Sequence, residues 1–203
     1  MRIFAVNGSP RKKGNTETLV RAFLRGAEQA GADFELVRLT DLHIQPCIGC
    51  GGCEKTGECV LQDAMQELYP KIQAADRVVL ASPIYFYGIT AQAKAFVDRC
   101  QALWSYRRLR ERKGEWRDDP LRAGFLLSVA ATRGQKVFDG AILTARYAFE
   151  AMGLPYGGEF LVRGKDGRGE LALDSGTLAR AEEAGRKMAA GGDEEGYFSK
   201  NQE

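Results

Sequence analysis

Four cysteines are concentrated in one short segment of the chain, with the spacing Cys47-x2-Cys50-x2-Cys53-x5-Cys59. Repeated two-residue spacing lets one loop wrap a [4Fe-4S] cluster, because successive thiolates then reach different iron atoms. The glycines at 49, 51, 52 and 57 permit tight wrapping and leave N–H groups for the sulfurs. Pro46 stiffens the entry to the segment. The spacing predicts a cluster held by Cys47, Cys50, Cys53 and Cys59.

Two other interpretations of these thiols remain open. A zinc staple usually uses two separated CxxC pairs, which this compact run does not have. A loop of reduced thiols without any ligand is the second alternative. The fifth cysteine, Cys100, lies on the apolar stripe of a predicted helix and is expected in the core. His43 is the single histidine, so metal sites that need two imidazoles are excluded.

A second candidate site is the basic, glycine-containing turn at residues 8–16, which follows an apolar run at 2–6. The hydroxyls of Ser9 and Thr16, the charge of Arg11 and the N–H groups at a helix N-terminus are suited to a phosphate. The turn is neither a Walker loop nor a GxGxxG motif. The alternative is a basic surface turn in which Asn15 or Thr16 only caps the helix.

The elements that position these segments alternate along the chain. Apolar runs predict strands at 2–6, 34–39, 77–81, 123–131 and 159–162. Helical periodicity predicts helices that begin at Asn15 or Thr16 and that span 64–75, 91–104, 137–152 and 177–190, with Pro70 splitting or kinking the second. This alternation predicts one α/β domain over residues 1–190, a doubly wound five-stranded parallel sheet with helices on both faces.

Two segments fit this alternation poorly. Residues 105–122 carry seven basic and four acidic side chains and are predicted to be a charged excursion beside the fourth strand. Residues 191–203 form a polar, acidic tail that we expect to be flexible or docked on a partner.

Composition narrows the classes of function. Hydrophobic residues make up 44% of the 203 residues and charged residues 28%, as in ordinary globular proteins. The net charge of +2 gives no support to binding of nucleic acid or of a membrane surface. The longest apolar stretch, near 125–131, is too short to span a membrane. We therefore expect a cytoplasmic protein, in which clustered cysteines favour ligation or redox chemistry over disulfides.

At this point the sequence resembles a known family. GSPRKKGNT at 8–16 is similar to the phosphate-binding loop of the flavodoxin-like NAD(P)H-dependent FMN reductases. SPIYFYG at 82–88, followed by AQAKAFVDR at 91–99, resembles the segment that holds the flavin ring in that family. ATRGQ at 131–135 matches a third flavin-contact loop, with Gly134 alone where many relatives have two glycines. The resemblance implies the strand order 2-1-3-4-5.

The resemblance also implies a cofactor site for FMN. Carried over residue by residue, the flavin contacts are Ser9, Arg11, Gly14, Asn15, Thr16, Pro83, Ile84, Tyr85, Phe86, Tyr87, Gly88, Ala131, Thr132, Arg133 and Gly134. No protein side chain is assigned a catalytic role, because FMN itself carries the hydride chemistry.

The cysteine spacing resembles the compact motif of the iron-sulfur flavoproteins, a branch of the same group that binds [4Fe-4S] beside FMN. That implies an oxidoreductase that moves electrons between NAD(P)H or ferredoxin, FMN and the cluster. It also implies a homodimer or homotetramer in which the cluster of one subunit approaches the flavin of another. The alternatives are a cluster-free NAD(P)H-dependent FMN or quinone reductase, and a non-catalytic electron carrier or zinc-stapled module.

Overall fold

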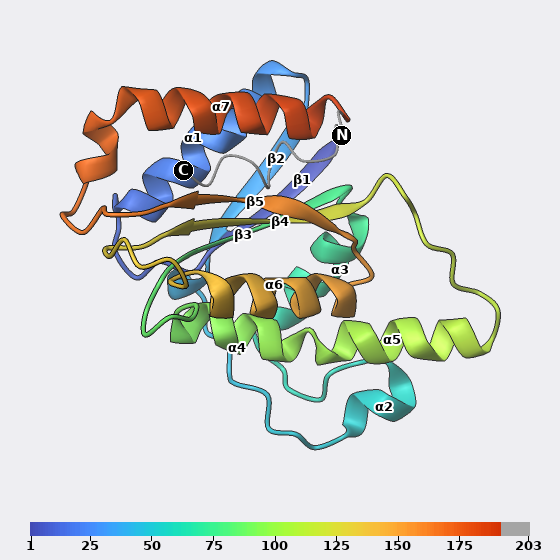
Figure 1. The fold of residues 1–203 in the computed structure, drawn as a ribbon. Helices are drawn as coiled ribbons and strands as arrows, with labels where there is room; N and C mark the ends of the chain where they lie inside the picture. Colours follow the sequence, from blue (N-terminus) through green and yellow to red (C-terminus); the bar gives the residue numbers. More distant parts are fainter. Residues whose placement is uncertain (192–203) are drawn as a thin grey trace.

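The computed structural model describes residues 1–191, and a five-stranded parallel sheet forms its centre (Figure 1). The strands are β1 (Arg2–Asn7), β2 (Asp33–Arg38), β3 (Arg77–Pro83), β4 (Ala123–Val129) and β5 (Tyr156–Val162). They lie in the order β2-β1-β3-β4-β5, and every neighbouring pair is parallel. The predicted fold class and strand order are confirmed.

Helices cover both faces of the sheet. On one face lie α1 (Asn15–Gln29) and α7 (Ser175–Ala189), and on the other lie α3 (Met65–Ala74), α4 (Ala91–Arg99) and α6 (Asp139–Ala151). The α5 helix (Gln101–Arg112) continues from α4. Two apolar clusters, one on each face, form the core. The inner strands are mostly apolar because they are buried on both sides over most of their length.

The α1 and α7 helices approach each other through glycines. A Cβ at Gly26 would lie 1.8 Å from the carbonyl oxygen of Glu182, and a Cβ at Gly185 would lie 1.8 Å from that of Phe23. No side chain can occupy either position at this separation of the helices. The contact therefore fixes α7 directly on the backbone of α1.

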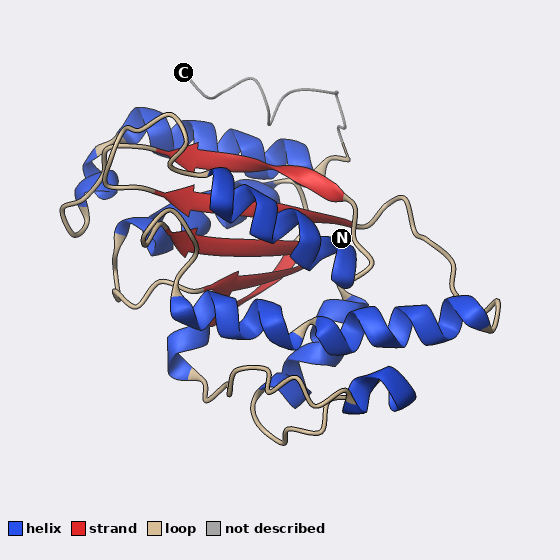
Figure 2. Ribbon diagram, turned by 60° about the horizontal axis from the view of Figure 1, so that its bottom comes forward, coloured by secondary structure: helices blue, strands red, loops and turns tan. Residues whose placement is uncertain are grey.

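All five strands point the same way, so the loops that follow them gather at one edge of the sheet (Figure 2). The cysteine segment leaves this edge after β2 and the short helix η1 (Leu39–Asp41), passes through α2 (Gly52–Thr56), and lies on the outer side of α4 and α5. Gly57 closes it against α5, since a Cβ there would lie 3.0 Å from the Cα of Tyr106. The cysteines and the sheet edge are thus on different sides of the α4–α5 layer.

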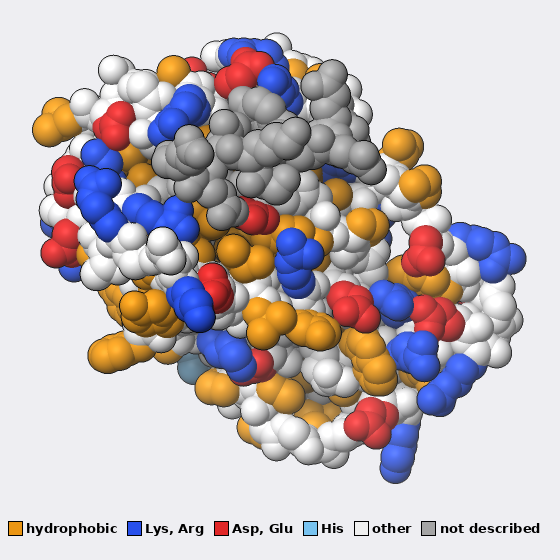
Figure 3. Space-filling view, viewed as in Figure 1, with side chains coloured by type: hydrophobic (Ala, Val, Ile, Leu, Met, Phe, Trp, Pro, Cys, Tyr) orange, Lys and Arg blue, Asp and Glu red, His pale blue; other side chains and the backbone are white. Residues whose placement is uncertain are grey.

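The charged segment at 105–122 is helical in its first half, which the sequence did not predict. The predicted helix at 91–104 breaks at Cys100, and α5 then extends the helical structure to Arg112. Its charges are paired along the helix, as in Arg107–Glu111 and Arg108–Glu111. Basic and acidic side chains accordingly alternate at this end of the molecule (Figure 3). The excess of basic side chains in this segment is therefore interspersed with acidic ones.

Other boundaries differ slightly from the expected ones. The α3 helix runs through Pro70 without being split, and β5 begins three residues before the predicted strand at 159–162. Within residues 1–191, no helix has the length and apolar character needed to cross a bilayer. The predicted tail at 191–203 lies, apart from Gly191, outside the described residues.

Candidate functional site

The first loop joins β1 to α1 and packs against the N-terminus of α4. The N–H of Gly8 donates to the carbonyl of Ala81 (2.8 Å), and the Thr90 hydroxyl donates to the carbonyl of Gly8 (2.7 Å). A Cβ at Gly8 would lie only 2.7 Å from the Cβ of Ala93. Position 8 therefore needs glycine so that the loop can approach α4 this closely.

The α1 helix begins at the end of this loop without a side-chain cap. Its N-cap residue is Gly14, which has no side chain to accept a hydrogen bond. The first N–H groups of a helix have no partner within the helix, and its dipole attracts negative charge to this end. The N–H groups of Asn15 and Thr16 are therefore placed to bind an anion.

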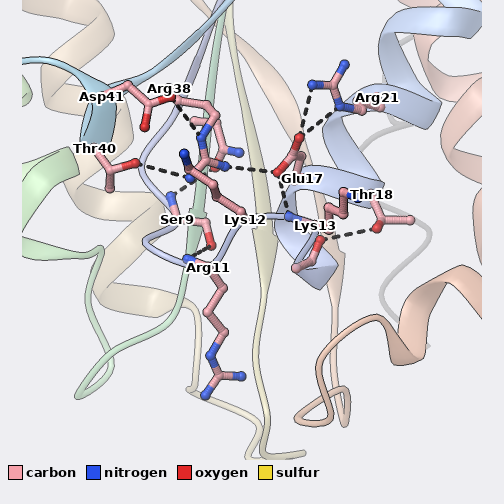
Figure 4. Close-up of polar contacts among 12 residues, drawn as sticks. Ser9, Arg11, Lys12, Lys13, Glu17, Thr18, Arg21, Arg38, Thr40 and Asp41 are labelled. Atoms are coloured by element: carbon pink, nitrogen blue, oxygen red, sulfur yellow. Dashed lines mark hydrogen bonds and ion pairs between the residues drawn. The ribbon is translucent and has the colours of Figure 1, made fainter.

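A buried carboxylate holds the shape of the loop beside that helix end (Figure 4). Glu17 accepts a hydrogen bond from the N–H of Lys13 (2.8 Å), whose φ of 54° is left-handed, and it pairs with Arg21 and Arg38. Burial alone would raise the pKa of Glu17, but the Lys13 N–H and the two guanidinium groups hold that pKa below its usual value. The Arg11 side chain points away from this network.

The segment after β3 forms a tight turn that presents three aromatic side chains. Tyr85 and Gly88 exchange backbone hydrogen bonds of 2.9 and 3.0 Å. Between them, Phe86 and Tyr87 have left-handed φ values of 49° and 62°, which bulky residues adopt only at a cost in energy. Phe86 is fully exposed, while Tyr85 and Tyr87 are about half exposed. Such a strained aromatic surface is suited to a flat aromatic ligand.

A cavity of about 120 Å³ lies at the α1 N-terminus, at the carboxyl edge of the sheet. Its walls come from the three predicted loops and from the segment after β5. The lining residues are Ser9, Arg11, Gly14, Asn15, Thr16, Pro83, Ile84, Tyr85, Val129, Ala131, Lys165 and Asp166. Hydroxyls, basic groups and a helix end meet here beside apolar walls. The cavity can therefore receive an anionic group attached to an apolar or aromatic one.

The cavity brings together nine of the predicted cofactor contacts: Ser9, Arg11, Gly14, Asn15, Thr16, Pro83, Ile84, Tyr85 and Ala131. The other six, Phe86, Tyr87, Gly88, Thr132, Arg133 and Gly134, do not line it. A Cβ at Gly164 would lie 2.8 Å from the Arg133 guanidinium, so Arg133 packs against that segment. The role of all fifteen as ligands stays a prediction.

Sequence reasoning missed the segment after β5, which contributes Lys165 and Asp166. It is tied to the first loop, because the Asn15 amide donates to the carbonyl of Gly167 (2.9 Å) and Arg11 donates to that of Asp166 (3.1 Å). The Asn15 side-chain oxygen also accepts the N–H of Leu171 (3.0 Å). The Asn15 side chain is thus occupied within the protein. The one signal in the sequence was a lysine among glycines after the last strand.

The four clustered cysteines line a separate cavity of about 130 Å³ on the outer side of α5. All four are free thiols; Cys47 and Cys50 are exposed, whereas Cys53 and Cys59 are half-buried. The Ser105 hydroxyl of α5 lies 3.5 Å from the sulfur of Cys53. Within residues 1–191, no three His, Cys, Asp or Glu side chains stand close enough together to hold a metal ion. The loop therefore has the donor set of an iron-sulfur site without a closed coordination geometry.

Three side chains near this loop are deeply buried. Cys100 has no exposed surface, as expected for a core residue, and burial raises the pKa of its thiol. Arg99 and Asp63 form a buried ion pair, and burial by itself disfavours the charged form of each group. The hydrogen bonds between them outweigh this effect, so that the pKa of Arg99 is raised and that of Asp63 is lowered. Both therefore stay ionised beside the cysteines.

Comparison with known proteins identifies the family of this chain. Residues 1–160 match the family described as NADPH-dependent FMN reductase. An iron-sulfur flavoprotein of Methanocaldococcus jannaschii is 39% identical over 114 residues, covering 56% of this chain and 59% of the relative. One of Archaeoglobus fulgidus is 42% identical over 99 residues, covering 49% and 45%. The matched region thus spans about half the length of these curated relatives.

Solved structures show the same fold at low sequence identity. An NAD(P)H:quinone oxidoreductase from Methanothermobacter marburgensis superposes with a TM-score of 0.67 at 18% identity, covering 93% of this chain and 96% of the other. An archaeal flavodoxin superposes with a TM-score of 0.56 at 14% identity, covering 94% and 97%. At such identities the likeness establishes the flavodoxin-like architecture alone.

Proposed function

The chain belongs to the NADPH-dependent FMN reductase family, and from that premise we propose that it is an FMN-dependent oxidoreductase. The observation that carries the proposal is the cavity at the uncapped N-terminus of α1, lined by Ser9, Arg11, Thr16 and Lys165. A phosphate group satisfies the free N–H groups of this helix end and the basic charge around it. The strained aromatic turn at 85–88 lies beside the same cavity.

Each part of the site has a distinct task in this proposal. The α1 N-terminus and Thr16 bind the phosphate, and the first loop is kept in place by Glu17 and Thr90. Tyr85 and its neighbours contact the flavin ring. FMN, when bound, supplies the hydride and single-electron chemistry. The protein side chains then need only to bind, orient and shield the cofactor.

Binding of FMN by variants of Thr16 tests this assignment. Thr16→Val removes a buried hydroxyl that lines the cavity and keeps the branched shape of the side chain. Because a hydrogen bond to a charged group contributes about 1.5–3 kcal/mol, we expect FMN affinity to fall roughly tenfold or more. Thr18→Val is the matched control, since that hydroxyl donates to the carbonyl of Gly14 in the same helix turn but does not line the cavity. Unchanged FMN affinity in Thr16→Val, measured by fluorescence titration, would contradict the site.

We further propose that the cysteine loop holds a [4Fe-4S] cluster that exchanges electrons with FMN. The supporting observation is that Cys47, Cys50, Cys53 and Cys59 are free thiols around one cavity. A zinc ion, or no ligand at all, are the alternatives. Iron, acid-labile sulfide and zinc per flavin, measured on anaerobically purified protein, distinguish the three. We expect Cys53→Ser to lose iron and Cys100→Ala, in the core, to retain it.

The electron partners and the assembly are parts of the same proposal. The donor is NAD(P)H or a reduced ferredoxin, and anaerobic bleaching of the flavin by each candidate identifies it. The cysteine loop and the proposed flavin site at the carboxyl edge of the sheet lie on different sides of α4 and α5. We therefore propose that electrons pass from cluster to flavin between subunits of a homodimer or homotetramer. Exposed apolar side chains on α6, Leu143 and Tyr147, support such an interface. Sedimentation at several protein concentrations tests it, and a monomer throughout would contradict it.

A further inference from the structure

The two ends of the cysteine loop are joined by one arginine from the end of α4. Arg99 donates through Nη1 to the carbonyl of Gln45 (2.9 Å), which precedes the loop. Through Nη2 it donates to the carbonyl of Leu61 (3.3 Å), which follows the loop. The guanidinium therefore bridges the entry and the exit of the segment that carries all four cysteines.

Asp63 completes this junction. Its carboxylate accepts two hydrogen bonds from Arg99, at 2.6 and 3.1 Å, and one from the N–H of Gln45 at 2.9 Å. It also accepts the N–H of Met65, the first residue of α3, at 3.0 Å. We call this set of contacts among Arg99, Asp63, Gln45 and Leu61 the neck of the loop. The neck is closed by protein groups alone and needs no metal.

The ion pair in the neck is almost fully buried, and burying it lowers the stability of the folded protein. The side chain of Arg99 is 0% exposed and that of Asp63 is 1% exposed. Moving two charges out of water costs energy that their attraction only partly returns, and apolar replacements are often equally stable. Because stability alone does not account for the pair, its charge and its geometry point to a role in the neighbouring site.

That site is the cysteine cavity. Arg99 lines the cavity together with Cys47, Cys50, Cys53 and Cys59. Its Nε is buried and has no partner among the described residues. A permanent positive charge is thus fixed beside sulfurs that become negative when they ligate iron.

We propose that Arg99, oriented by Asp63, is the positioning residue of the cysteine site: it holds the ends of the loop together and sets the charge that determines the reduction potential of the bound redox group. The inference rests on the proposed cluster. Hydrogen bonding and charge around the sulfurs are the main means by which a protein tunes such a potential.

Variants of opposite charge test the electrostatic part. Asp63→Asn keeps the shape but leaves the positive charge of Arg99 unbalanced, so we expect the midpoint potential of the cluster to become more positive. Arg99→Gln removes that charge, so we expect a more negative potential, with a smaller shift if Asp63 takes up a proton. Arg99→Lys keeps the charge and should stay nearer the wild-type value. The control is Lys94→Gln on the same helix, whose exposed pair with Asp98 is screened by solvent and should not move the potential.

A second measurement examines the neck without any cluster. In iron-free protein we expect the half-buried thiols of Cys53 and Cys59 to be alkylated at least several-fold faster in Arg99→Gln than in wild type, because the ends of the loop separate. Lys94→Gln should react at the wild-type rate. The alkylation rates can be measured even if Arg99→Gln does not retain a cluster.

The outcomes separate the two proposals. If wild-type protein contains no iron or sulfide, the cluster assignment fails, while the alkylation rates still decide whether the neck closes the loop. If the cluster is present, the inference is overturned when Asp63→Asn and Arg99→Gln shift the potential in the same direction or not at all. If both variants fail to fold, Arg99→Lys tests the inference, because lysine keeps the charge but cannot make all the bonds of the neck. The inference then requires a potential near that of wild type together with faster alkylation of Cys53 and Cys59, and a wild-type alkylation rate would overturn it.

Discussion

The hydroxyl of Thr90 donates a hydrogen bond of 2.7 Å to the carbonyl of Gly8, and it accepts one of 3.3 Å from the N–H of Ala93. One side chain therefore caps α4 and attaches the first loop to that helix. Because Gly8 also bonds to Ala81 at the end of β3, the two proposed flavin-binding loops are held as a unit. The spacing of the two walls of the site depends on this contact.

The first prediction concerns that contact. Thr90→Val removes the cap and the bond to Gly8 together, so we expect a loss of about 1–2 kcal/mol in the free energy of unfolding. FMN affinity should fall as well, because the first loop is no longer fixed. Thr90→Ser retains both hydrogen bonds and should remain close to wild type. Urea unfolding and FMN titration measure the two effects, and a Thr90→Val protein with wild-type affinity would contradict the coupling.

The second prediction concerns the contact between α1 and α7. Gly185→Ala places a methyl group against the carbonyl of Phe23, so the helices must separate, and we expect destabilisation on the order of 1–3 kcal/mol. Gly176→Ala serves as the matched control in α7, because the nearest atom to its Cβ is 3.8 Å away. The control should be neutral or slightly more stable, since alanine favours helix. Equal thermal midpoints for the two variants would be inconsistent with the close approach.

The third prediction concerns Lys165, which lines the cavity at the proposed phosphate site and pairs with Asp174 at 3.0 Å. Lys165→Ala should weaken FMN binding about tenfold through loss of a charged contact. Riboflavin, which lacks the phosphate, should bind wild type and variant alike. Lys71→Ala removes a lysine paired with Glu35 away from this cavity and should affect neither ligand. An equal loss for riboflavin and FMN would mean that Lys165 supports the loop without contacting the phosphate.

The fourth prediction concerns acid stability. The N–H of Thr177, the Lys165 ammonium and the Thr177 hydroxyl lower the pKa of Asp174 from 3.8 to about 2. Since the folded-state pKa is lowered, the stabilisation by the carboxylate is present above pH 3.8 and is lost as the pH falls towards 2. Asp174→Asn keeps the helix cap but cannot titrate. The stability difference between wild type and variant in urea unfolding should therefore be larger at pH 7 than at pH 3; a constant difference would refute this.

Much of the fold was predictable because β1, β3 and β4 are buried on both faces and read as continuous apolar runs. The beginning of β5 was missed because Gly157 and Gly158 suggest a turn. In the fold, however, a Cβ at Gly157 would lie 2.4 Å from the ring of Phe125, so close packing requires glycine inside the strand. The extent of α5 was missed because beyond Trp104 its length is supported by ion pairs such as Arg107–Glu111, which have no apolar periodicity.

The candidate site was predictable where it is local in sequence. The first loop lies between a strand and a helix, and its place at the sheet edge follows from that order. Lys165 could not be assigned, because its position depends on contacts such as Asn15–Gly167, between residues far apart in the chain. The neck of the cysteine loop was missed for the same reason. Arg99 belongs to a motif recognised beside the flavin loops, but its side chain reaches Gln45 and Asp63 instead.

The glycine contact between α1 and α7 has a consequence for where this domain can be cut. The matched family region stops at residue 160, before α7 begins at Ser175. Yet α7 packs on the backbone of α1, the helix whose first turn is the proposed anion site. A recombinant fragment ending near 160 would expose the apolar side of α1 to water, and we expect it to aggregate before it could be assayed. Chimeras that exchange residues 1–160 between homologues should therefore include the last helix as well.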